Sequence, residues 1–162
     1  IPAEVLDHKA FASREDFDAE LARRIDAHAP DLVILAGFMR ILTPGFVRHY
    51  AGRLLNIHPS LLPRYPGLHT HQRALEAGDT EHGATVHFVS EDLDGGPAIV
   101  QARVQVLPGD TPETLAARVL QHEHLIYPLA ARLYAEGRLR LQGERAELDG
   151  SPLPVHGMPL DA

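Results

Sequence analysis

The sequence predicts an α/β domain of the doubly wound type, with a mostly parallel, Rossmann-like sheet. An apolar run at 31–37, bounded by a proline and a glycine, has the composition of a strand buried on both faces, and 53–58 is the next strand. Segments with helical spacing, at 13–28 and 43–50, precede these strands, and such alternation is typical of parallel sheets. The 162 residues are enough for one domain and too few for two, so we expect a single domain over 1–162.

The first helix is predicted to begin at Ser13, because the sequence Ser-Arg-Glu-Asp resembles a capping box. Phe17 and Ile25 follow at helical spacing, and Pro30 ends the pattern. We expect this helix to cross over to the strand at 31–37.

A second helix is predicted from Thr43 to Gly52, with Pro44 at its first helical position. The strand at 53–58 follows it. The prolines at 59–67 then predict a shaped loop in place of a regular element.

After the proline-rich loop, the sequence predicts a helix at 69–77 and two strands, at 83–90 and 97–106. An acidic, glycine-rich connection at 91–96 joins the two strands.

The longest predicted helix opens with Asp-Thr-Pro-Glu at 110–113 and ends at Gly137. We expect 138–162 to form a short terminal hairpin and then a loose tail from Ser151.

The composition excludes several classes of function. Because the chain has no cysteine, disulfides, thiolate catalysis and sulfur-ligated metals are excluded. In each of two histidine pairs, His69/His71 and His122/His124, the histidines are two residues apart, whereas those of a helical zinc pair are four apart. We therefore expect no metal site.

Charge and hydropathy exclude two further classes of partner. The net charge of −7 argues against nucleic-acid binding. Without a bilayer-length apolar run or an export leader, we expect no membrane insertion and a cytoplasmic location.

Polar residues follow the predicted strands at 37–42, 56–60 and 90–96. Since ligands bind at the carboxyl ends of strands in α/β sheets, we expect these segments to form one site. Asn56 and His58 are two residues apart in a strand, so their side chains point the same way.

Burial of this amide and imidazole is costly unless each is hydrogen-bonded or lies at a cleft. A satisfied core pair is one interpretation of Asn56 and His58, and an ordinary turn residue is one interpretation of Asp94, which precedes two glycines. If the fold brings Asp94 to His58, the carboxylate would hold the imidazole and favour its charged form.

Four segments carry a resemblance to a known family. They are Gly-Phe-Met-Arg-Ile-Leu at 37–42, Leu-Asn-Ile-His-Pro-Ser-Leu-Leu-Pro at 55–63, His-Gly-Ala-Thr-Val-His-Phe-Val at 82–89 and Leu-Asp-Gly-Gly-Pro at 93–97. The sequence between about 13 and 138 resembles the phosphoribosylglycinamide formyltransferases, folate-dependent enzymes of purine synthesis. The Asn-x-His-Pro-Ser signature is shared with related formyltransferases and hydrolases, whereas 65–71 and Asp-Gly-Gly-Pro narrow the resemblance to this family.

The resemblance implies a formyltransferase-type fold and transfer of the formyl group of 10-formyltetrahydrofolate to the amine of glycinamide ribonucleotide. It implies that Asn56, His58 and Asp94 are catalytic. Asn56 and a protonated His58 could stabilise the oxyanion of a tetrahedral intermediate, and His58 could protonate the leaving nitrogen while Asp94 orients water. Neither a covalent enzyme intermediate nor a metal is implied.

The resemblance also implies the residues that contact the two substrates. Core packing is the alternative for Met39, Ile41 and Leu42, a solvated side chain is the alternative for Arg14, and Arg40 could meet the glutamate tail of the folate. The implied folate contacts are Arg14, Met39, Arg40, Ile41, Leu42, Val47, Leu54, Asn56, Val89, Ser90, Glu91, Asp92, Leu93 and Asp94.

Gly37 and Glu123 are the implied contacts to glycinamide ribonucleotide, and an exposed helix carboxylate is the alternative for Glu123. His69 and His87 are candidates to support the site. Arg64, in the proline-rich loop, is a candidate for attracting phosphate or folate, with a solvated loop residue as the alternative.

The chain departs from the family pattern at its start, because no Gly-Ser-Gly-Ser-Asn phosphate loop is present. We therefore expect one or more N-terminal βα units to be missing, which would leave the strand at 31–37 at an open sheet edge. The alternatives to a formyltransferase are a folate-binding fragment with little turnover and a formyltetrahydrofolate hydrolase. Either way the partners are small molecules, and the chain is expected to be a monomer or homodimer.

Overall fold

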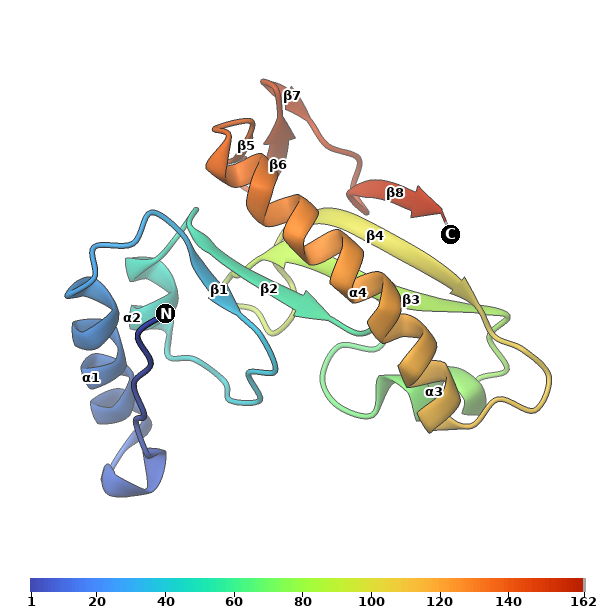
Figure 1. Ribbon diagram of the computed structural model, residues 1–162, viewed down its shortest axis with the longest axis horizontal. Coiled ribbons are helices and arrows are strands. Elements are labelled where there is room, and N and C mark those ends of the chain that lie inside the picture. Colours follow the sequence, from blue (N-terminus) through green and yellow to red (C-terminus); the bar gives the residue numbers. More distant parts are fainter. Residues whose placement is uncertain (162) are drawn as a thin grey trace.

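The computed structural model describes residues 1–161, and its main sheet has five strands in the order β1-β2-β3-β4-β8 (Figure 1). The strands are β1 (Val33–Leu35), β2 (Leu54–His58), β3 (Glu81–Phe88), β4 (Ala98–Gln105) and β8 (Met158–Asp161). The pairs β1/β2 and β4/β8 are parallel, whereas β2/β3 and β3/β4 are antiparallel. The sheet is therefore mixed, and the prediction of a mostly parallel sheet was wrong.

The lengths of the connections explain the antiparallel pairs. Residues 91–96 join β3 to β4 without a helix, and strands joined by a short loop run in opposite directions. The connection from β2 to β3 contains only α3 (Thr70–Glu76), whose seven residues span about 10 Å. Such a short helix does not return the chain along the full length of a strand.

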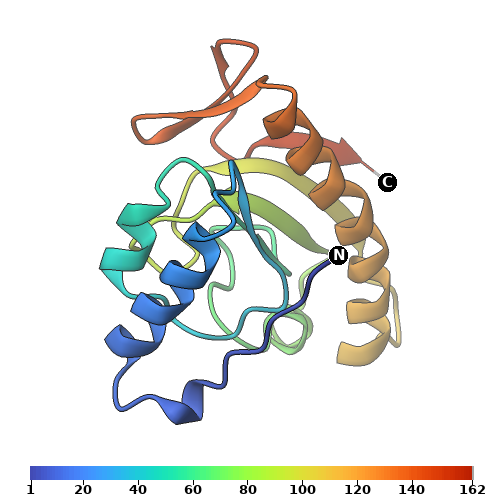
Figure 2. The ribbon, with the colours of Figure 1, turned by 60° about the vertical axis from the view of Figure 1, so that its left-hand side comes forward.

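Helices cover both faces of β2. Figure 2 shows α1 (Arg14–Asp26) and α2 (Pro44–His49) on one side of the sheet and α4 (Pro112–Ala135) on the other. Leu54 packs in the apolar cluster of α1 and α2, and Leu55 packs in the larger cluster that includes α4. Because neighbouring strand residues point to opposite faces, β2 separates two helical layers, as the doubly wound class predicts.

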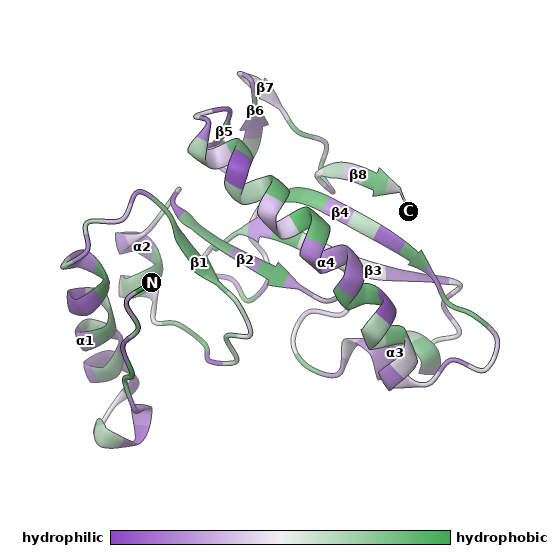
Figure 3. Ribbon diagram, in the orientation of Figure 1, coloured by the Kyte–Doolittle hydropathy of each residue, from purple (hydrophilic) through white to green (hydrophobic). Residues whose placement is uncertain are grey.

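The predicted helix starts are confirmed. The hydroxyl of Ser13 accepts the backbone N–H of Asp16 at 3.0 Å, and the hydroxyl of Thr43 accepts a backbone N–H of α2. Thr111 and Thr114 form a reciprocal capping box at the start of α4. In Figure 3, hydrophobic and hydrophilic residues alternate along α4, whose buried residues pack against β3 and β4. A short 3₁₀ helix, η1 (His8–Ala10), precedes α1.

The strand predicted at 31–37 is shorter and less buried than expected. β1 covers three residues and lies at one end of the strand order, beside β2 alone. The side chain of Ile34 is 45% exposed, so the expectation of burial on both faces was wrong. Among residues 1–161, no helix combines the length and hydropathy needed to cross a lipid bilayer.

The C-terminal segment forms a second, smaller sheet and then returns to the first. β5 (Leu139–Gln142) and β6 (Arg145–Leu148) form the predicted hairpin, which β7 (Ser151–Pro152) extends. β8 then pairs with β4, so the prediction of a loose tail from Ser151 was wrong for the described residues. Ala162, the last residue of the predicted domain range, lies outside them.

Candidate active site

The polar residues predicted to converge do meet, in a cavity of about 450 Å³ at the carboxyl ends of β1 and β2. Its walls come from 37–41, which follows β1, from 56–59 at the end of β2, and from 67–71. Residues 93–94 of the β3/β4 connection and Glu123 of α4 complete it. The fold thus assembles residues far apart in sequence at the strand ends.

His58 and Asp94 lie side by side and are both buried. Nδ1 of His58 is 3.4 Å from a carboxylate oxygen of Asp94, and Nε2 is 2.7 Å from the carbonyl oxygen of Tyr65. A neutral imidazole donates from only one nitrogen, whereas the charged ring donates from both. Both nitrogens of the His58 ring therefore face oxygen acceptors, and the two side chains predicted to meet are in contact.

Asp94 has an unusual backbone conformation, and its side chain accepts a hydrogen bond from the opposite loop. Its carboxylate accepts the backbone N–H of Gly67 at 2.9 Å, which joins the two loops around the cavity. Asp94, Tyr65 and His69 all have positive φ angles, of 52°, 52° and 57°. Residues other than glycine rarely adopt this conformation, and such strain is often found at functional sites.

Asn56 contacts His87, a candidate supporting residue. Nδ1 of His87 donates to the carbonyl of Phe88 at 2.9 Å, and its Nε2 is 3.4 Å from Nδ2 of Asn56. Burial lowers the pKa of His87, which keeps this ring neutral. Nε2 therefore accepts one amide proton of Asn56, and the same nitrogen of Asn56 has a second proton to donate. His69 also lines the cavity.

Besides Asn56, Leu93 and Asp94, the predicted folate contacts Met39, Arg40 and Ile41 line the cavity. Met39 is 75% exposed and Ile41 is 58% exposed, so core packing does not explain either residue. The guanidinium of Arg40 lies 4.5 Å from the ring centre of Phe17, and its buried Nε has no hydrogen-bond partner within residues 1–161.

Five predicted folate contacts line neither this cavity nor the second one described below, and their binding role stays a prediction. Leu54 and Val47 are buried, Leu54 in the cluster of α1 and α2, and Leu42 packs against that cluster. Arg14 is exposed at the start of α1, and Glu91 forms an ion pair with Arg48 at 2.8 Å.

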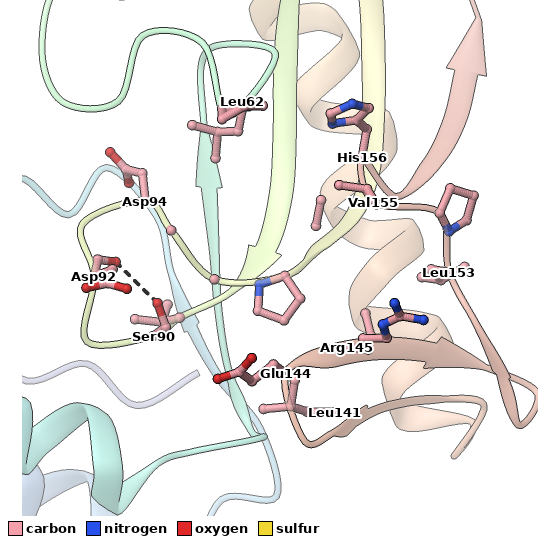
Figure 4. A pocket seen from close by; sticks show the side chains of 18 of the residues that line it. Leu62, Ser90, Asp92, Asp94, Leu141, Glu144, Arg145, Leu153, Val155 and His156 are labelled. Carbon is pink, nitrogen blue, oxygen red and sulfur yellow. Dashed lines mark hydrogen bonds between the residues drawn. The ribbon is translucent and has the colours of Figure 1, made fainter.

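The connection at 90–96 lies between two cavities. Leu93 and Asp94 line the first, whereas Val89, Ser90, Asp92 and also Asp94 line a second cavity of about 940 Å³ (Figure 4). In Figure 4 the carboxylate of Asp94 points away from the far wall of this second cavity.

Glu123 and Gly37, the predicted contacts to glycinamide ribonucleotide, both line the first cavity, and their binding role stays a prediction. Glu123 is half-buried, and burial raises its pKa, so it differs from an ordinary exposed helix carboxylate. Gly37 has a φ of +60°, a conformation that side-chain-bearing residues rarely adopt.

Two features of the site were not predicted. The carbonyl of Tyr65 is a backbone group and leaves no signal in a sequence pattern. Nε2 of His82 lies 3.1 Å from Nδ1 of His71, which lines the cavity, and burial lowers the pKa of His82 to about 4. The predicted candidate Arg64 does not line the cavity, and its guanidinium lies 3.7 Å from the carboxylate of Asp79. Within residues 1–161, no three His, Cys, Asp or Glu side chains gather in a way that could hold a metal ion.

Comparison with known proteins identifies the family. Residues 1–131 match the formyl transferase family. The phosphoribosylglycinamide formyltransferase of Escherichia coli (strain K12) is 58% identical over 161 residues, which cover 99% of this chain and 76% of that protein. The chain belongs to the phosphoribosylglycinamide formyltransferase family. The enzyme of that name from Haemophilus influenzae is 50% identical, over 97% of this chain and 74% of its own length.

Solved structures of related enzymes superpose on the chain and support the same family. The phosphoribosylglycinamide formyltransferase of Coxiella burnetii superposes with a TM-score of 0.95 at 52% identity, covering 99% of this chain and 75% of its own. A formyltetrahydrofolate deformylase from Pseudomonas syringae pv. tomato superposes with a TM-score of 0.80 at 33% identity. The match covers 88% of this chain and 47% of the deformylase chain. The predicted formyltransferase identity is therefore confirmed, and the hydrolase alternative is not supported.

Proposed function

We propose that this phosphoribosylglycinamide formyltransferase transfers the formyl group through Asn56, His58 and Asp94. The family uses 10-formyltetrahydrofolate as the formyl donor in de novo purine biosynthesis. The observation that carries the proposal is the His58 ring, with one nitrogen toward Asp94 and the other toward the Tyr65 carbonyl. The ring lines a cavity with the amide donor of Asn56 on the same strand.

The reaction needs an oxyanion stabilised and two protons moved. When the amine of glycinamide ribonucleotide attacks the formyl carbon, the carbonyl oxygen becomes an oxyanion, and Asn56 and His58 donate hydrogen bonds to it. The attacking nitrogen gives a proton to a water molecule held by Asp94, and the tetrahydrofolate nitrogen gains a proton from His58 as the carbon–nitrogen bond breaks. The proton taken from the amine then passes from this water molecule to the His58 ring, so the acid is restored and no covalent enzyme intermediate is needed.

The two substrates approach from different walls of the cavity. We assign the folate to the wall of Met39, Arg40 and Ile41, because two exposed apolar side chains and a cationic one suit a ring with an acidic tail. We assign glycinamide ribonucleotide to Gly37 and Glu123, where a carboxylate can hold the amine. All of these residues come from one chain, which is consistent with a monomer or homodimer.

The test is His58→Gln, assayed for formyl transfer from 10-formyltetrahydrofolate to glycinamide ribonucleotide. We expect kcat to fall by about 10²–10⁴-fold, because the variant keeps a polar side chain but loses the acid. The dissociation constant for the folate should stay within about two-fold, since no folate contact is removed.

The matched control is His28→Gln, which changes an exposed histidine beyond the end of α1. Unchanged kcat in His58→Gln would refute the mechanism. A wild-type chain that binds folate but transfers no formyl group would instead favour the folate-binding fragment.

A further inference from the structure

One side-chain hydroxyl joins α4 to the sheet at the point where β1 and β2 end. The hydroxyl oxygen of Tyr127 lies 2.5 Å from the carbonyl oxygen of Leu35 and 3.0 Å from that of Leu55. Leu35 is the last residue of β1, and its register partner on β2 is Asn56, which follows Leu55. A hydroxyl has one proton, so Tyr127 shares it between the two carbonyls, with the shorter contact to Leu35.

Both carbonyls belong to segments that build the cavity. Leu55 directly precedes Asn56, and Leu35 lies two residues before Gly37. The hydroxyl of Tyr127 therefore fixes the distance between α4 and two walls of the site at once.

Glu123 lies one helical turn before Tyr127, and residues four apart lie on the same side of a helix. Its half-buried carboxyl lines the cavity beside Gly37. Any displacement of this turn of α4 changes the distance between Glu123 and the ends of β1 and β2.

A proline weakens the helix at the same turn. Pro128 has no backbone N–H, so α4 lacks the helical hydrogen bond to the carbonyl of His124. Prolines within helices are also common positions of kinks. Tyr127, next to this break, supplies an anchor that the helix itself does not provide there.

We propose that Tyr127 is a positioning residue that holds Glu123 at the distance needed to bind glycinamide ribonucleotide. The inference rests on the proposed function, in which Glu123 contacts this substrate. Burial raises the pKa of Tyr127 and keeps its hydroxyl protonated as a donor. The hydroxyl of Tyr127 contacts no residue of the folate wall at 39–41, whereas Glu123 lies on the same helix one turn away, so the larger effect falls on the ribonucleotide.

The variant Tyr127→Phe removes the hydroxyl and keeps the ring. We expect its KM and dissociation constant for glycinamide ribonucleotide to rise by about ten-fold, because small displacements of binding groups have large effects. The KM for 10-formyltetrahydrofolate should change by less than about two-fold. Calorimetry of glycinamide ribonucleotide binding gives the same readout without turnover.

Tyr134→Phe is the matched control. Tyr134 lies on the same helix, is also partly buried, and its hydroxyl makes no hydrogen bond to another described residue. It should leave both KM values unchanged. Thermal melting of each variant shows whether it folds.

A double-mutant cycle with Glu123→Gln separates positioning from general stabilisation. If Tyr127 acts through Glu123, the change Tyr127→Phe has little further effect on ribonucleotide binding once Glu123 is replaced. Equal changes in both KM values, or an effect that persists in the Glu123→Gln background, would overturn the proposal. Those outcomes leave the role of His58 intact, whereas a His58→Gln variant with normal kcat refutes the proposed mechanism and leaves the Tyr127 result standing.

Discussion

His58 is the residue on which the proposed chemistry depends, and each of its ring nitrogens faces an acceptor oxygen. A carboxylate oxygen lies at Nδ1 and a carbonyl oxygen at Nε2. To donate to a substrate, the ring must exchange one of these acceptors for the reacting atom. We infer that Asp94 stays in contact with Nδ1 and orients the ring, while the substrate takes the place of the Tyr65 carbonyl at Nε2.

Replacement of Asp94 by asparagine tests this division of labour. Asn tolerates the left-handed backbone at φ 52°, so the change acts mainly on charge. We expect kcat to fall by about 10²-fold or more with folate affinity preserved, as for loss of an acid–base partner. Steady-state kinetics and folate binding give the two readouts.

Asp149→Asn is the control for Asp94→Asn, because Asp149 has the same φ angle but lies in the turn after β6, where it pairs with Arg138. Its kcat should equal that of the wild type. A variant at Asp94 that lost folate affinity while keeping kcat would contradict the assigned role.

His82 gives the protein a pH-dependent stability. Burial lowers the pKa of this ring from 6.5 to about 4 in the folded chain. Between these two values the unfolded chain binds a proton that the folded chain excludes, so the free energy of unfolding falls as pH falls from 6.5 to 4. The contribution is at most roughly 3 kcal/mol.

Urea unfolding of His82→Gln at several pH values measures this contribution. The variant has no titrating ring at this position, so its stability should fall less steeply than that of the wild type between pH 6.5 and 4. Part of the slope remains, because burial also lowers the pKa values of His71 and His87. An unchanged slope in the variant would show that His82 is not buried in a neutral state.

At the scale of elements, the connection between β3 and β4 does more than reverse the chain. It carries Asp94, it separates two cavities, and its glycines allow close packing against β3. A Cβ atom on Gly96 would lie 1.8 Å from the carbonyl oxygen of Phe88, which is far inside van der Waals contact. The second glycine of the Asp-Gly-Gly-Pro segment is therefore needed for the loop to reach its position.

Gly96→Ala should displace this loop. We expect destabilisation of about 2–4 kcal/mol, from a backbone clash that no rotamer relieves, and a loss of kcat because Asp94 moves with the loop. Gly45→Ala on α2 is the control, since its added Cβ meets nothing within 4 Å and its φ is not positive. Denaturant unfolding and kinetics measure both effects, and a stable Gly96→Ala enzyme with normal kcat would contradict the expectation.

The elements themselves were well predicted where local chemistry determines them. Ser13, Thr43 and Thr111 each cap a helix at the predicted residue, because a hydroxyl satisfies backbone donors that the helix leaves free. The convergence of Asn56, His58 and Asp94 rested on the resemblance together with the rule for strand ends. No local pattern could have found the pairing of His87 with Asn56, since it joins two strands.

At the scale of the whole molecule, strand direction was the main error. The helix–strand alternation of the first half of the chain, from which a mostly parallel sheet was predicted, does not continue through β3 and β4. Direction depends on how far each connection travels, and neither 91–96 nor the short α3 can return the chain for a parallel pair. β8 was missed for a different reason, because its four residues include a proline and have no clear alternation.

β8 lies at the end of the strand order opposite β1, and its pairing with β4 depends on Gly157. Gly157 has a φ of +78°, and a Cβ there would lie 2.6 Å from the backbone of Ile99 on β4. Gly157→Ala should therefore detach β8 from β4 and expose that strand. We expect the free energy of unfolding to fall by about 2–4 kcal/mol, through both the strained φ and the backbone clash.

The position of β8 also predicts what Gly157→Ala leaves unchanged. β3 and β4 lie between β8 and the strand that carries Asn56 and His58. At temperatures well below the unfolding transition, both KM values and kcat should therefore match those of the wild type. Urea unfolding and steady-state kinetics on the same preparation distinguish the outcomes: a variant of wild-type stability would show that β8 docks without this close approach, and a changed KM would show that the far edge of the sheet is coupled to the site.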